Sequence, residues 1–242
     1  MTETSVYLQP AFILQQRKFR ETSLIIDVLT RDFGRISLLA KGVRKAKSKT
    51  AGLLQPFVPL LLSYVGKPEL KILSGIEIIP NGIELKGLAL YCGFYINELI
   101  GFFLHQYDPH PEVFSDYADC LLRLSAENNH LSNNSKIEAA LRIFEFNLMV
   151  NAGYGLQLEH DYRHEKPVDP LKKYAFDVQQ GPVEAEDGCY SGKALLALNS
   201  RQFNDPQVLM EAKTLMRTVI NVHLQGKPLK SRAVINQIVK NL

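Results

Sequence analysis

Five short strand-like runs occupy the first 80 residues, and no helical segment separates them. Each run is rich in Ile, Val, Leu and Phe, and turn-prone segments such as RDFG and VGKPE lie between the runs. Because parallel strands need helical crossovers, these runs predict a small antiparallel barrel. The expected strands are 11–17, 23–30, 34–41, 57–65 and 70–79. A five-stranded barrel of this size is typical of an OB-fold, and an SH3-like barrel is the structural alternative.

After residue 82 the apolar residues recur with a helical period. Helices are predicted at about 88–103, from Pro111 to about 125, from Ser135 to a stop at Gly153, at about 206–224, and after 231. Ser135 and Glu138 have the spacing of a capping box. Asp205 before Pro206 has the form of an N-cap before a first-turn proline.

Residues 156–190 follow neither period, because they are polar and interrupted by Pro and Gly. They offer only 174–178 as a strand, so they predict an irregular insert between helices. The chain is therefore expected to be a multi-domain α+β protein. Residues 1–80 would form the OB-fold barrel domain, and residues 81–242 a helical domain that contains the insert at about 156–190.

Composition places the chain among ordinary folded proteins, with 46% hydrophobic and 22% charged residues in 242. No apolar stretch approaches the roughly 18 residues needed to cross a bilayer, and the N-terminus lacks the pattern of a signal peptide. The three cysteines are too few and too scattered for a disulfide framework. We therefore expect a cytoplasmic protein with no membrane partner.

Basic residues are concentrated in KGVRKAKSK, residues 41–49, where five of nine residues are basic and none is acidic. Charge also segregates along the chain. Residues 1–80 carry 12 Lys and Arg against 6 Asp and Glu, residues 81–220 carry 12 against 19, and residues 221–242 carry 4 against none. A dense cluster of one sign between two strands favours a polyanionic partner such as nucleic acid, although a solvated loop is the alternative.

Two further basic groups resemble phosphate-binding patches. Arg17, Lys18 and Arg20 are expected in the first inter-strand turn beside Phe19, which would either stack on a base or fold back over the barrel mouth. The segment GKPLKSR places three cations around a proline turn before the final helix, at Lys227, Lys230 and Arg232. The alternative for Lys227 is a favourable charge at a helix C-terminus.

Catalytic motifs are poorly represented. His160 and His164 have the i, i+4 spacing of one helical face, and Cys189 lies downstream, but HExxH and CxxC are missing. The sequence also lacks GxxxxGK[ST] and a GxGxxG after a strand. We therefore expect no catalytic residues, no bound metal and no cofactor. A metal-dependent hydrolase that uses the two histidines is kept as a distant alternative.

Five segments, taken in order, resemble the bacterial RecO recombination-mediator family of DNA repair proteins. They are ETSLIIDVLTRDFGRISLLAKGVRK, LLQPFVPLLLSYVG, LYCGFYINELI, LRIFEFNLMVNAGYG and GKPLKSR. The resemblance implies an N-terminal OB-fold, a helical bundle and, in many members, a zinc-finger-like insert. The insert of this chain lacks the four cysteines, so no zinc is predicted. The resemblance also implies a non-enzymatic, nucleoid-associated protein that binds single- and double-stranded DNA and anneals complementary strands. With RecR, such a protein helps RecA to displace single-strand-binding protein.

The resemblance implies particular site residues as well. DNA contacts carry over to basic residues of the barrel, namely Arg35, Lys41, Arg44, Lys45, Lys47 and Lys49. Family members bind the acidic, apolar C-terminal tail of single-strand-binding protein (SSB), which here implies Arg142 with Leu141 and Phe144. The alternative role of Arg142 is a surface ion pair with Glu138. An RNA-binding OB-fold factor is the alternative function, since charge and barrel do not separate RNA from DNA.

Overall fold

The computed structural model describes residues 4–46, 48, 50–67, 70–80, 82–127 and 134–240. Two compact units, residues 1–125 and 126–242, divide the chain, and each is described by itself. The barrel and the first two helices share the first unit, and the predicted domain boundary at residue 80 stays a prediction. Among the helices of the described residues, none has the length and apolarity that a membrane crossing needs.

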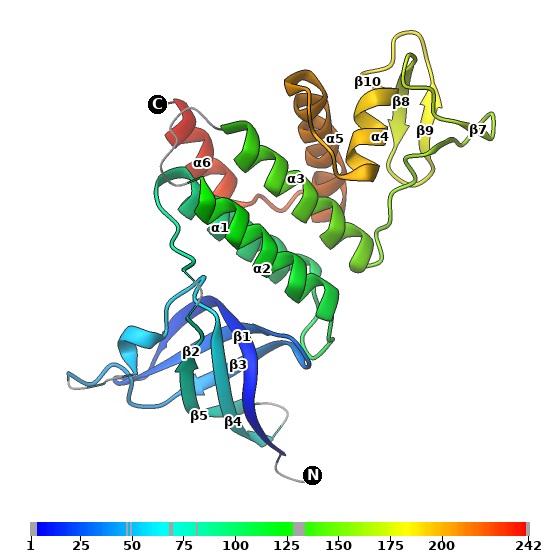
Figure 1. Cartoon of the computed structure of the whole chain (residues 1–242). Helices are drawn as coiled ribbons and strands as arrows, with labels where there is room; N and C mark the ends of the chain where they lie inside the picture. Colours follow the sequence, from blue (N-terminus) through cyan, green and yellow to red (C-terminus); the bar gives the residue numbers. More distant parts are fainter. Residues whose placement is uncertain are drawn as a thin grey trace. The chain divides into compact units, whose positions relative to one another are not determined.

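The first unit contains a closed five-stranded barrel (Figure 1). Its strands are β1 (Thr4–Phe19), β2 (Ser23–Thr30), β3 (Gly34–Ala40), β4 (Leu60–Lys67) and β5 (Leu70–Ile78). The order β1-β2-β3-β5-β4 confirms the predicted OB-fold over the SH3-like alternative. The barrel is not wholly antiparallel, however, because β3 and β5 pair in parallel through Leu38 and Lys71.

Inward-facing side chains fill the barrel, although register shifts in β1 and β4 interrupt the alternation of the two faces. The inward-facing residues are fully or nearly fully buried and are mostly Ile, Leu and Val, with Tyr64 among them. Two strand ends differ from the prediction. β1 continues from Thr4 to Phe19, and β4 begins at Leu60 rather than at residue 57. Phe57 has a positive φ of 69°, which takes it out of an extended strand.

Helices α1 (Gly87–Phe103) and α2 (Pro111–Ala126) lie where the helical periods predicted them. Both pack against the outer face of β1. The Phe12 ring lies 5.4 Å from that of Phe114 and 5.0 Å from that of Tyr117. Buried Asn97 donates from Nδ2 to the Leu14 carbonyl at 2.9 Å and accepts from the Tyr117 hydroxyl at 2.6 Å. Apolar packing and two buried hydrogen bonds thus attach the helices to the barrel.

The second unit is built on α3 (Asn134–Asn151), α4 (Gly192–Ser200), α5 (Pro206–Leu224) and α6 (Lys230–Lys240). Asp205 caps α5 by accepting from the Gln207 amide at 2.8 Å, and α3 ends before Gly153, as predicted. The predicted capping box is wrong, because α3 begins at Asn134 and Ser135 lies inside its first turn. The short helix α4 was not among the predicted elements.

Five short strands lie in residues 156–191, which the sequence predicted to be irregular with a single strand. They are β6 (His160–Asp161), β7 (Lys166–Pro167), β8 (Lys173–Asp177), β9 (Gly181–Glu184) and β10 (Tyr190–Ser191). β10, β8 and β9 form one sheet beside α4, and β6 pairs with β7 (Figure 1). Because strands of two to five residues are too short to show a period of two, the sequence pattern missed four of them.

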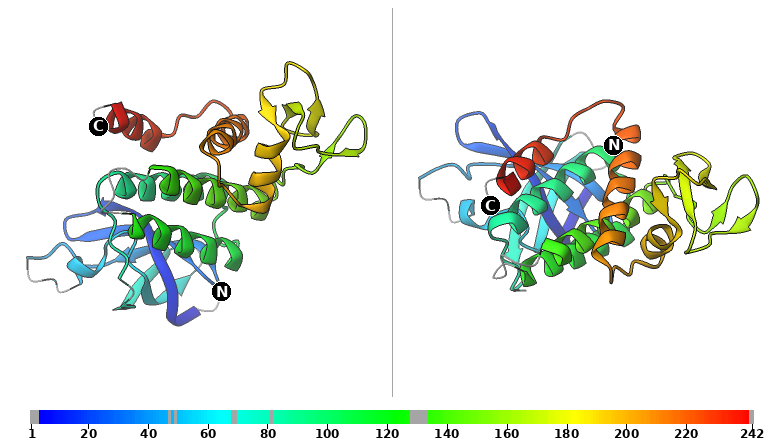
Figure 2. Two further views of the ribbon diagram at one scale, coloured as in Figure 1. Left: turned by 45° about the horizontal axis from the view of Figure 1, so that its top comes forward. Right: turned by 90° about the horizontal axis from the view of Figure 1, so that it is seen from above.

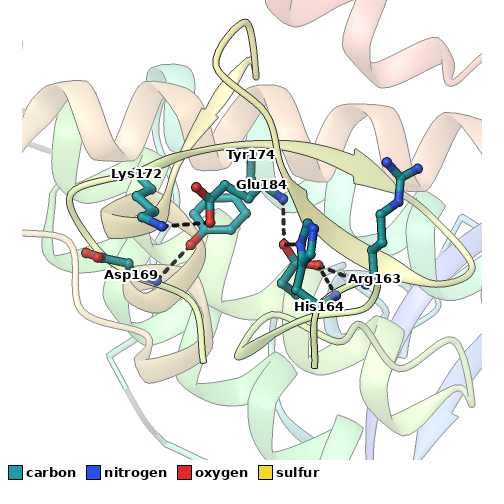
Figure 3. Close-up of polar contacts among 7 residues, drawn as sticks. Arg163, His164, Asp169, Lys172, Tyr174 and Glu184 are labelled. Atoms are coloured by element: carbon teal, nitrogen blue, oxygen red, sulfur yellow. Dashed lines mark hydrogen bonds and ion pairs between the residues drawn. The ribbon is translucent and has the colours of Figure 1, made fainter. Parts of the chain in front are cut away.

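The carboxylate of Asp161, 3% exposed, holds this insert together. Its Oδ1 accepts from the backbone amides of Arg163 and His164, and its Oδ2 accepts from the Glu184 amide at 2.7 Å. The Nδ1 atom of His164 lies 2.9 Å from Oδ2 (Figure 3). Burial by itself raises the pKa of Asp161, but the His164 ring and the three amides outweigh burial and lower it. The insert is therefore tied by an ionised carboxylate.

We expect Gly34→Ala to destabilise the protein more than Gly82→Ala. Both glycines have a positive φ, +65° and +68°, which costs a residue with a Cβ about 1–2 kcal/mol. A Cβ at Gly34 would also overlap the backbone of Asp108, whereas at Gly82 it meets open space. The extra overlap predicts an additional loss of about 1–3 kcal/mol in the free energy of unfolding, measured by urea titration. Equal losses for the two variants would contradict this close approach of the β2–β3 turn to Asp108.

We expect the insert to lose stability as the pH falls below about 3.9, the pKa of an unfolded aspartate. The pKa of Asp161 is lower in the folded state, so its stabilisation is present above 3.9 and is lost as the pH falls toward the folded value. Asp161→Asn should remove this pH dependence and weaken the insert by about 2 kcal/mol. Amide hydrogen exchange at Arg163 and Glu184 would measure both effects. Exposed Asp187→Asn is the control, and equal protection in the two variants would contradict the role of Asp161.

Candidate nucleic-acid interface

The basic segment after β3 lies against the turn between β1 and β2. Val43 is 4% exposed and packs into the barrel core, which fixes the start of the segment. Its neighbour Arg44 donates from its backbone amide to the Thr22 carbonyl at 2.9 Å and from Nη1 to the Arg20 carbonyl at 3.1 Å. Both views in Figure 2 show the dark-blue hairpin tip and the lighter blue loop extending from the same side of the barrel. Two basic segments that are separate in sequence thus meet in the fold.

Six exposed cations gather where these segments meet: Arg17, Lys18, Arg20, Lys41, Arg44 and Lys45. Within the part of the chain that the structure describes, none of them is in an ion pair. We call this group the hairpin-end cluster. The predicted position of two members was wrong, because Arg17 and Lys18 lie in β1 and only Arg20 lies in the turn. Lys47 and Lys49, also predicted to bind DNA, lie outside the described residues.

Arg35 lies apart from the hairpin-end cluster. It is six residues from Lys41 along β3, a distance of about 20 Å in an extended strand. Its Nη1 donates to the Gly101 carbonyl of α1. Burial lowers the pKa of Arg35, and the Asp27 carboxylate opposes that shift. The guanidinium is thus half-buried against α1, and its predicted role in DNA binding has no support from this position.

Acidic and neutral polar groups occupy the outer face of β2 and β3 near Arg35. The Ser37 hydroxyl donates to Asp27 Oδ1 at 2.5 Å and accepts from Gln106 Nε2 at 3.3 Å. The loop after α1 also bonds to β3, through the Tyr107 amide and the Arg35 carbonyl at 3.0 Å. A carboxylate and a covering loop make this half of the sheet unfavourable for phosphates. The barrel surface that suits a polyanion is its hairpin end.

The second basic patch lies in the second unit, around the turn between α5 and α6. Lys227 follows the C-terminus of α5, and its amide donates to the Leu224 carbonyl at 3.0 Å. The prediction placed Lys230 and Arg232 before the final helix, but both lie in the first turn of α6. Cations there oppose the helix dipole, so helix stability does not explain them. Arg232 Nη1 donates to Asn221 Oδ1 at 2.5 Å and is thereby tied to α5.

Arg142, the residue expected to hold the SSB tail, is buried. Its side chain pairs with Glu138 at 3.1 Å and with Glu145 at 2.5 Å. The alternative pairing with Glu138 is therefore present, with Arg142 only 5% exposed and the Glu138 side chain partly exposed. Leu141 and Phe144 are also buried in α3. A more accessible cation, Lys213, joins Arg142 and its two glutamates. Its Nζ lies 2.5 Å from Glu138 Oε1, although the two residues are 75 positions apart in sequence. No local sequence signal marks Lys213.

The two histidines of the metal hypothesis do not share a helical face. His160 lies in β6, His164 lies in the following turn, and the Nδ1 atom of His164 is bound to Asp161. Cys189 is exposed in a separate open cleft of about 430 Å³ between β10 and α5. Among the described residues there is no group of three or more His, Cys, Asp or Glu placed to hold a metal ion. These residues do not fit a zinc site, and the hydrolase alternative loses its structural premise.

Two family descriptions match the chain almost from end to end. Residues 1–81 match "Recombination protein O N terminal" and residues 85–233 match "Recombination protein O C terminal".

Similar proteins carry the name DNA repair protein RecO. That of Methylococcus capsulatus is 42% identical over 94% of this chain and 92% of its own length. That of Dechloromonas aromatica is 40% identical over 95% of both chains. That of Shigella flexneri is 38% identical over 96% of this chain and 94% of its own. These matches show that the chain belongs to the RecO family of DNA repair proteins.

Proposed function

We propose that this protein is a non-enzymatic recombination mediator that binds single- and double-stranded DNA and anneals complementary strands. With RecR, it helps to load RecA onto single strands coated by SSB, and it acts at the nucleoid in the cytoplasm. The observation that carries the DNA-binding part is the hairpin-end cluster, in which two basic segments are held together by Arg44. Membership of a DNA repair family supports DNA as the polyanion.

The chemistry of the hairpin-end cluster favours phosphate contacts over base reading. Lysine and arginine side chains neutralise phosphates and release condensed counterions, which is independent of sequence. If all six cations contact a single strand, the logarithm of affinity falls against the logarithm of salt concentration with a slope of about 4. Binding of this kind suits a protein that must act on strands of any sequence.

The double reversal Lys41→Glu/Lys45→Glu should weaken single-strand binding and reduce its salt dependence. Both side chains are exposed, and neither donates a side-chain hydrogen bond among the described residues, so the barrel should stay folded. Loss of two phosphate contacts should lower the slope from about 4 to about 3. Fluorescence anisotropy with a labelled oligonucleotide at several salt concentrations measures both quantities.

A matched control reverses two exposed cations of the second unit, Lys193→Glu/Arg217→Glu, with the same change in net charge. This control should lose less affinity and keep the slope. Equal effects of the two double variants would contradict the placement of the site at the hairpin end. Competition between DNA and RNA oligonucleotides of matched sequence decides between the DNA proposal and the RNA alternative.

The acidic tail of SSB is the proposed partner of the second unit. Arg142 is already paired with two glutamates, so an incoming carboxylate would have to displace one of them. Lys213, with 42% of its side chain exposed, is the group of this cluster that a tail reaches first. The proposal keeps Arg142, Leu141 and Phe144 as the floor of the site and adds Lys213 at its surface.

Lys213→Ala should weaken binding of a tail peptide, whereas Lys193→Ala on α4 should not. Arg142 itself is a poor test, because removal of one partner from a buried ion pair costs about 3–5 kcal/mol of stability. Annealing of strands precoated with SSB should also fall when SSB lacks its tail. Equal annealing with both forms of SSB would contradict the partnership, and equal peptide affinity of the two variants would contradict its placement.

A further inference from the structure

Phe19 is the aromatic residue at the hairpin end, and the strand register places it on the outside of the barrel. Gln16 lies opposite Ile26, whose side chain is in the core, so Arg17 opposite Ile25 faces outward. Side chains two residues apart in a strand share a face, and Phe19 therefore shares the outer face with Arg17. Phe19 is not among the partly buried hydrophobic residues that pack against the barrel core. The alternative that it folds back over the barrel mouth is not what the register shows.

The Phe19 ring is half-buried and has a cation over it. The guanidinium carbon of Arg20 lies 5.3 Å from the ring centroid, within the range of a cation–π contact. Arg17, another member of the hairpin-end cluster, shares the outer face of the strand with Phe19. A planar cation and an aromatic ring next to phosphate-binding side chains form the combination on which unpaired bases stack.

The backbone at Arg20 is strained, and Arg44 holds it in place. Arg20 has a φ of +50°, a conformation that a residue with a Cβ rarely adopts. Its carbonyl accepts the hydrogen bond from Arg44 Nη1, and the Arg44 amide bonds to Thr22 in the same turn. Backbone strain persists where surrounding contacts over-determine it, and it is common at ligand sites. Here those contacts support the turn that carries Arg20 beside Phe19.

We propose that Phe19 and Arg20 form a stacking platform for an unpaired nucleobase, which gives the hairpin end a preference for single strands. The proposal rests on the proposed DNA-binding function and deepens it. Phosphates on either side of the base would be held by neighbouring cations of the cluster. A base pair within a duplex is already stacked on its neighbours, so the platform adds nothing to duplex binding.

Phe19→Ala should weaken single-strand binding about five- to a hundredfold, the effect of removing one base–aromatic stack. Duplex affinity should stay within about twofold, and the salt slope for single strands should not change, because no phosphate contact is lost. An unchanged single-strand affinity overturns the platform. Equal losses for single strands and duplex overturn it too, since they indicate a structural role. In both cases the proposed function is still tested separately, by the decrease in the salt dependence of single-strand binding that Lys41→Glu/Lys45→Glu should cause.

A tryptophan reporter tests the stacking itself. The chain contains no tryptophan, so Phe19→Trp introduces the only one. We expect single-stranded DNA at saturation to quench its fluorescence and duplex to leave it nearly unchanged. Phe33→Trp is the matched control, because Phe33 is 39% exposed in the β2–β3 turn near the Arg35 end of β3. Equal quenching of the two reporters, or none at position 19 with DNA bound, overturns the proposal.

Discussion

Arg44 stands at the junction on which the candidate site depends. Val43 is buried in the barrel core, and this anchor directs the Arg44 amide and guanidinium to two carbonyls of the β1–β2 turn. Without these hydrogen bonds, the basic loop and the basic hairpin would be two separate charged segments that repel each other. With them, six exposed cations share one end of the barrel, and the strained turn at Arg20 is held beside Phe19. Under the proposed function, DNA phosphates would neutralise the repulsion among these cations.

Elsewhere the chain uses charged groups to hold its own structure. Asp161 binds three amides and the His164 ring, so an ionised carboxylate organises an insert whose strands are only two to five residues long. The same principle applies at Arg142, where a buried guanidinium joins two glutamates of α3. Charges that are buried need partners within the fold, whereas the cations of the hairpin end are left to solvent. The buried Asp161 and Arg142 thus hold the fold together, and the exposed cations of the hairpin end are accessible to a ligand.

Much of the fold could be predicted from local patterns. Short apolar runs separated by turn-prone segments predicted the five strands of the barrel, and the helical period predicted α1, α2, α3 and α5 close to their observed bounds. Asp205 before Pro206 located the start of α5, because a cap depends on a few neighbouring residues. The insert could not be predicted in this way. Its ladders are too short to show a period, and its central carboxylate bonds to Glu184, 23 residues away.

The candidate site, like the fold, was predictable from the sequence only in part. The sequence by itself determined which residues are basic, that they cluster in 41–49 and near Phe19, and that a barrel carries them. Only the tertiary structure decided which of these cations act together. The parallel pairing of β3 with β5 closes the barrel, the Arg44 hydrogen bonds join the loop to the turn, and α1 takes Arg35 out of the group. These contacts join residues 22 to 66 positions apart. Local periodicity carries no information about such distances, because it reports only which face of an element is buried.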